Sequence, residues 1–100
     1  MPVAADALIG DAKHMIDCGD LEGLQELYAA LQEDTGGACD QAYLFRHIYV
    51  HACLRHQTDI ASWLRKEVFE AMDPIMQIGL RHIFAYGDYL LRLKLRVRDL

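Results

Sequence analysis

Apolar side chains recur at three- and four-residue spacing along most of this chain, and this period constrains the fold more than any other feature. Over residues 5–16, for example, Ala5, Ile9, Ala12 and Ile16 share one face of a helix. Similar stripes occupy residues 21–31, 42–53 and 60–72. Hydrophobic residues make up 53% of the 100 positions, enough to bury such stripes against one another. The pattern predicts an all-α protein.

Short polar turns separate the first helical stripe from the second, and the third from the fourth. Gly19 suits the left-handed position that ends a first helix, and Asp20 can cap the next one. A third helix is expected from Asp40 to about His56, with Thr58 or Asp59 capping a fourth. Because the connections are so short, consecutive helices are expected to pair as antiparallel hairpins.

The second half of the chain contains two further boundary signals. Asp73 followed by Pro74 predicts the start of a fifth helix, in which Met76, Leu80, Ile83 and Phe84 are apolar. The run Tyr86-Gly87-Asp88 repeats the pattern Cys18-Gly19-Asp20, and it predicts another turn before a sixth segment. We therefore expect five or six short helices, arranged as a stack of hairpins or as a compact bundle.

The clearest break in the pattern lies near residues 32–38, where two adjacent glycines follow polar residues. We interpret it as a loop between two halves of a single domain that comprises residues 1–100, because a chain of this length is one domain's worth. Residues 91–98 are ambiguous. Their strict alternation of apolar and basic residues is typical of a strand, but Leu90, Leu93, Val97 and Leu100 also share a helical face, and we favour a helix.

Three segments resemble one another, because each is predicted to form a helix, a tight polar turn and a second helix. Registered on Gly19, His56 and Gly87, they lie 37 and 31 residues apart. In the second of them, Ala52-Cys53, Asp59-Ile60-Ala61 and Trp63-Leu64 resemble a divergent ankyrin repeat, although His56 stands where the turn glycine is expected and no Thr-Pro-Leu-His opening occurs. The resemblance covers about 40 residues loosely and 52–64 best. It implies stacked hairpins that bind a protein partner, and no catalytic residues.

Charge is distributed unevenly along the chain. Residues 1–50 carry nine acids and only two bases, Lys13 and Arg46, whereas residues 51–100 carry six acids and eight bases. Such asymmetry suits a protein partner or a second copy of the chain, as in a homodimer. The acidic pI of about 5.4 argues against direct binding of nucleic acid, and repulsion of the acidic half by anionic lipid argues against a membrane surface.

The cysteines indicate a reduced, intracellular protein, and we expect a cytoplasmic location. Cys18, Cys39 and Cys53 cannot pair completely and form no Cys-x-x-Cys motif. Cys53 has His51 and His56 close by in sequence, but no loop that could stabilise an oxyanion accompanies it. The sequence contains no nucleophile–base motif or phosphate-binding loop, and therefore predicts neither an enzyme nor a cofactor.

His47 and His51 are the weak candidates for a metal site, because they lie four residues apart and share a helix face. Ile48 replaces the glutamate of the metalloprotease motif, which excludes that activity on motif grounds. Helical phase favours solvent- or partner-facing histidines over metal ligands. Added Zn²⁺ is therefore expected to leave the melting temperature unchanged, and a rise of several degrees at stoichiometric metal would contradict this expectation.

The sequence favours a non-enzymatic protein–protein interaction module, with self-association as one form of the interaction. Helical phase selects the candidate contact residues as the exposed ones on the third and fifth helices: Arg46, His47, Val50, His51 and Arg81. Two alternatives stay open. One is a small acidic inhibitor that imitates nucleic acid and blocks a basic, nucleic-acid-binding partner. The other, which we favour less, is a histidine-based metal-binding protein.

Overall fold

The computed structural model describes residues 5–33 and 41–99, and every regular element in these ranges is helical. The elements are α1 (Ala5–Asp17), α2 (Leu21–Glu33), α3 (Gln41–Leu54), α4 (Thr58–Trp63), the π-helical segment η1 (Leu64–Val68), α5 (Pro74–Leu80) and α6 (His82–Asp99). The predicted all-α fold is confirmed. The predicted cap at Asp40 and most of the 32–38 loop lie outside the described residues, while Gln32 and Glu33 belong to α2.

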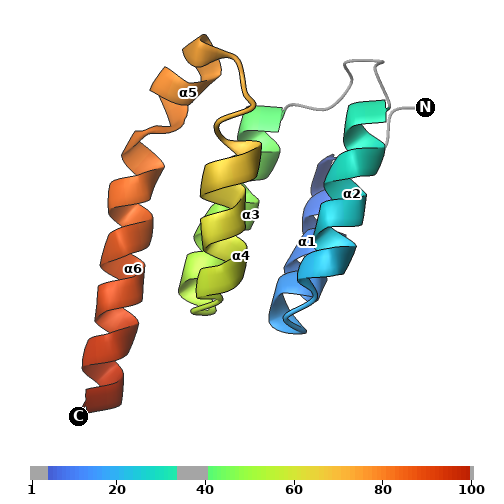
Figure 1. Cartoon of the computed structure of the whole chain (residues 1–100). Helices are drawn as coiled ribbons and strands as arrows, with labels where there is room; N and C mark the ends of the chain where they lie inside the picture. Colours follow the sequence, from blue (N-terminus) through green and yellow to red (C-terminus); the bar gives the residue numbers. More distant parts are fainter. Residues whose placement is uncertain (1–4, 34–40, 100) are drawn as a thin grey trace.

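The helices form two layers with α6 at one side (Figure 1). In the view shown, α2 and α4 lie in front of α1 and α3, and α6 lies beside α3 on the side away from α1. Helix α3 packs against both α1 and α6, and it is therefore the centre of the fold. Its buried residues are Leu44, Phe45, Ile48, Tyr49, Ala52 and Cys53.

The turns after α1 and α3 have the same hydrogen-bond pattern. In the first, the backbone N–H of Gly19 donates to Ile16 and that of Asp20 donates to Met15, at N···O distances of 3.0 and 2.8 Å. In the second, His56 donates to Cys53 and Gln57 to Ala52, again at 3.0 and 2.8 Å. Both are Schellman motifs, whose central residue adopts a left-handed conformation. Gly19 has φ 70° and His56 has φ 61°, so the predicted left-handed cap at Gly19 is confirmed.

Substitution of Gly19 and His56 tests the energetic cost of the left-handed conformation. Replacing Gly19 by alanine is expected to lower the free energy of unfolding by about 1–2 kcal/mol, because a Cβ is strained at positive φ. Replacing His56 by glycine is expected to raise it by about 0.5–1 kcal/mol for the same reason. Urea denaturation of both variants measures these free energies. If both variants change the free energy of unfolding in the same direction, the left-handed conformation is not what determines their stability.

Two predicted helix starts have different outcomes. The Asp73 carboxylate accepts a hydrogen bond from the Ile75 N–H at 2.8 Å, with Pro74 in the first turn, which confirms the start of α5. The capping role of Thr58 or Asp59 is wrong, because Gln57 occupies the N-cap position of α4 and no side chain caps it. The Gln57 side chain instead donates to the Ile16 carbonyl at 3.0 Å, which ties the second turn to the end of α1.

The turn predicted at Gly87 is wrong. The chain breaks at Arg81 instead, and α6 continues through Gly87 to Asp99. Gly87 is buried against α3, where a Cβ would come within 2.8 Å of the Cys53 Sγ and of the Tyr49 ring. The glycine therefore permits close helix packing and does not end a helix. The helical alternative for residues 91–98 is confirmed, although the side chains of residues 94–99 are outside the description.

Candidate functional site

A hollow of about 240 Å³ opens to solvent between α1 and α3. We call it the α1–α3 hollow, and its lining residues are Lys13, Arg46, His47, Val50, His51 and Leu54. Lys13 belongs to α1 and the others to α3. The fold thus brings together the only two bases of the first 50 residues, which are 33 positions apart in sequence.

The walls of the α1–α3 hollow combine positive charge with apolar surface. In the part of the chain that the structure describes, neither Lys13 nor Arg46 forms an ion pair, whereas Arg55 and Arg65 do. Val50 is half-buried and Leu54 is 52% exposed, so both present apolar surface beside the cations. A hollow of this composition suits a ligand that carries carboxylates next to apolar groups.

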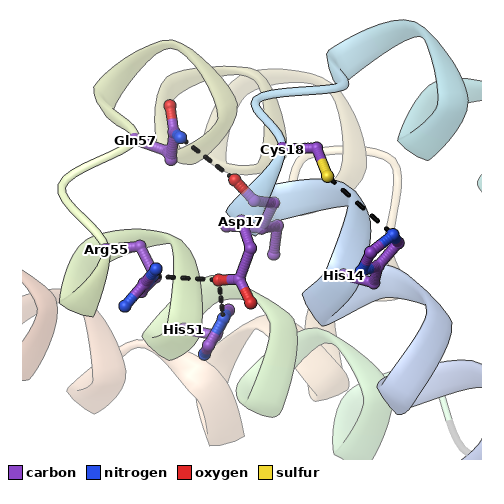
Figure 2. Close-up of polar contacts among 7 residues, drawn as sticks. His14, Asp17, Cys18, His51, Arg55 and Gln57 are labelled. Carbon is purple, nitrogen blue, oxygen red and sulfur yellow. Dashed lines mark hydrogen bonds and ion pairs between the residues drawn. The ribbon is translucent and has the colours of Figure 1, made fainter.

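A polar cluster joins the C-terminal ends of α1 and α3 beside the hollow (Figure 2). One carboxylate oxygen of Asp17 accepts a hydrogen bond from the His51 Nε2 at 2.8 Å. The same oxygen forms an ion pair with the Arg55 Nε at 2.9 Å. The hydrogen bond from His51, assisted by the charge of Arg55, lowers the pKa of Asp17 against the opposing effect of desolvation. These contacts hold His51 in position at the edge of the hollow.

The lowered pKa of Asp17 predicts how stability depends on pH. A carboxylate whose pKa is depressed by folding stabilises the protein above the ordinary aspartate pKa of about 3.9, and this contribution is lost as the pH falls through the lowered value. Asp17→Asn is therefore expected to melt below the wild type at pH 7, with the difference vanishing in strong acid. Thermal melts of Asp17→Asn and of a control, Asp11→Asn, measure this. An equal difference at all pH values would contradict the role of the carboxylate.

The sequence candidates are partly gathered by the fold. Four of them line the α1–α3 hollow, namely Arg46, His47, Val50 and His51. Arg81 lies between α5 and α6 and does not line it. Sequence reasoning missed Lys13 and Leu54 in the lining. It also missed the contact of Asp17 with His51, because 34 positions separate these residues. The scarcity of bases in the first half was the available signal for Lys13.

Metal-binding and thiol chemistry gain no support from the arrangement. Among the described residues, no three histidine, cysteine, aspartate or glutamate side chains gather so that they could hold a metal ion. The His51 Nε2 already donates to Asp17. Cys53 is buried, and desolvation raises the pKa of its thiol, which disfavours a thiolate nucleophile. Cys18 is exposed, with its Sγ 3.8 Å from the His14 Nε2.

A second hollow of about 220 Å³ lies between α3, α4, η1 and α6. Arg65 lines it, with its guanidinium carbon 4.3 Å from the centre of the Phe84 ring and a nitrogen 3.9 Å from the Asp88 carboxylate. Burial raises the pKa of Tyr49, which also lines it, to about 12. The two charged residues that line this hollow, Arg65 and Asp88, form an ion pair with each other, and we interpret the hollow as a gap between packed helices.

Comparison with known proteins adds no assignment. No family model matches the chain, and searches of curated proteins and of solved structures found no significant similarity. Within the described residues, no helix combines the length and the apolar character that crossing a membrane requires.

Proposed function

We propose that the protein is a non-enzymatic protein-interaction module whose α1–α3 hollow receives an acidic segment of a partner. The observation that carries the proposal is the convergence of Lys13 and Arg46, both without an ion pair in the described part of the chain, on one hollow of an acidic protein. Complementary charge of this kind speeds association and selects partners. The ankyrin resemblance of residues 52–64 favours the same class of function, and a cytoplasmic location fits it.

The alternative of an acidic mimic of nucleic acid receives less support. Two acids that such a mimic would present have structural roles instead. Asp17 is paired with His51 and Arg55, and Asp20 caps α2 by accepting a hydrogen bond from the Gly23 N–H at 2.9 Å. We therefore favour a protein that takes an acidic partner over one that blocks a basic partner.

Selection of displayed random peptides on the immobilised protein tests the proposal. We expect the selected peptides to be rich in Asp and Glu alternating with apolar residues, and to bind more weakly as salt rises. The double variant Lys13→Gln/Arg46→Gln should bind them about tenfold more weakly or worse. Lys66→Gln is the matched control, because Lys66 is an exposed base on η1 outside the hollow.

Two results would contradict the proposal. One is a selection with no preference for acidic peptides. The other is a set of peptides that bind the double variant as well as they bind the wild type. Circular dichroism should show the double variant folded, because Arg46 is exposed and Lys13 is only half-buried.

A further inference from the structure

Helix α2 carries negative charges, which are complementary to the positive charges of Lys13 and Arg46 in the α1–α3 hollow. Its sequence contains three glutamates and no lysine, arginine or histidine. Glu22 and Glu26 lie four positions apart, so they project from the same face of the helix, and both are exposed. No ion pair neutralises either glutamate within the described ranges.

The other described side chains on this face of α2 are uncharged. Gln25, Ala29 and Ala30 are exposed beside the two glutamates. Alanine side chains allow another surface to approach closely, and their methyl groups can rest on the apolar part of the hollow formed by Val50 and Leu54. Unpaired carboxylates on an alanine-bearing helix thus match unpaired cations beside apolar side chains.

We infer that the acidic segment taken by the α1–α3 hollow is the exposed face of α2 from a second copy of this chain, an inference that rests on the proposed function. Glu22 and Glu26 of one copy face Lys13 and Arg46 of the next. The charge asymmetry between the two halves of the sequence is consistent with such pairing, since the first half has nine acids and two bases.

The placement of the two surfaces determines the type of assembly. Helices α2 and α4 cover one side of α1 and α3 (Figure 1). A hollow that is open to solvent and lined by α1 and α3 alone therefore lies on the opposite side of the molecule from the exposed face of α2. Contacts between opposite surfaces are heterologous, so each added copy leaves one free hollow and one free α2. Assembly is expected to be head-to-tail and to extend with concentration.

Sedimentation velocity of the full chain tests this inference. The wild type is expected to sediment as a monomer when dilute and as species larger than a dimer when concentrated, with the larger species lost at high salt. Two double variants, Lys13→Gln/Arg46→Gln and Glu22→Gln/Glu26→Gln, should each stay monomeric when alone. Their equimolar mixture should form a complex of two chains, in which the intact α2 of the first variant occupies the intact hollow of the second. The complex should not grow, because its remaining hollow and its remaining α2 both carry substitutions. Lys66→Gln and Glu70→Gln are the controls, and both should assemble as the wild type does.

The outcomes separate this inference from the proposed function. A wild type that stays monomeric at every concentration and salt, or assembly that neither double variant weakens, would overturn the inference. Mixing that fails to restore association would also overturn it. If acidic peptides bind the hollow while the chain stays monomeric, the proposed function stands and the occupant is another protein.

Discussion

Phe45→Ala is expected to lower the free energy of unfolding by about 3–5 kcal/mol, as typical truncations of buried phenylalanines do. Phe45 is fully buried, and its ring lies 5.5 Å from the Tyr49 ring, 5.9 Å from Phe69 and 6.4 Å from Phe84 between centres. Removing it opens a cavity where α3 meets α6 and the segment after η1. Denaturation in urea, followed by circular dichroism, measures the loss.

Two further variants keep this prediction testable if the alanine variant does not fold. Phe45→Leu leaves a smaller cavity and is expected to lose less than Phe45→Ala. Ile78→Ala removes a side chain on α5 that is 71% exposed, so its effect should stay within about 0.5 kcal/mol. A loss below about 1 kcal/mol for Phe45→Ala would show that this residue is not in the core.

Gly87→Val is expected to lower the free energy of unfolding by about 2–3 kcal/mol, through overpacking between α3 and α6. The added Cβ would come within 2.8 Å of two buried atoms, the Cys53 Sγ and a carbon of the Tyr49 ring. Both belong to side chains that are held in the core, so neither can move away cheaply. The same denaturation measurement gives the value.

Gly10 provides the matched control for Gly87. It also lies within a helix, but a Cβ there would meet nothing within 4 Å. Gly10→Ala is therefore expected to stabilise the protein by up to about 1 kcal/mol through helix propensity, and Gly10→Val should stay within about 0.5 kcal/mol. If Gly87→Val and Gly10→Val have equal effects, close packing is not the reason for the glycine at position 87.

Features that depend on adjacent residues could be predicted from the sequence. The Asp73-Pro74 start and the Gly19 turn need only a few neighbours, because capping and a positive φ are local. The apolar stripes likewise predicted the all-α fold. A lone strand has no partner, which favours the helical alternative for residues 91–98, and these residues are helical in the structure.

Features that depend on tertiary packing could not be predicted. A glycine looks the same in sequence whether it ends a helix, as Gly19 does, or admits a neighbouring helix, as Gly87 does. Gln57 occupies the N-cap position of α4 without capping it, and its side chain instead donates to the carbonyl of Ile16, which is 41 positions away. The π-helical turn at residues 64–68 has no signal in the apolar period.

The candidate site could be predicted only in part, for a similar reason. Helical phase identifies residues of α3 that avoid the core, including Arg46 and Val50. It does not indicate which residue of another helix faces them. Lys13 joins the hollow because α1 packs on α3, and Arg81 stays apart because the chain breaks again before α6.

Nuclear magnetic resonance mapping of a bound acidic peptide tests most directly that the α1–α3 hollow is the binding surface. The ¹⁵N-labelled chain would be titrated with the tightest peptide from the display selection. If the hollow is the binding surface, the largest amide shifts are expected at Lys13, Arg46, His47 and His51, with Lys66 unchanged. Shifts concentrated elsewhere, such as on η1 or α5, or no shift at saturating peptide, would contradict this expectation.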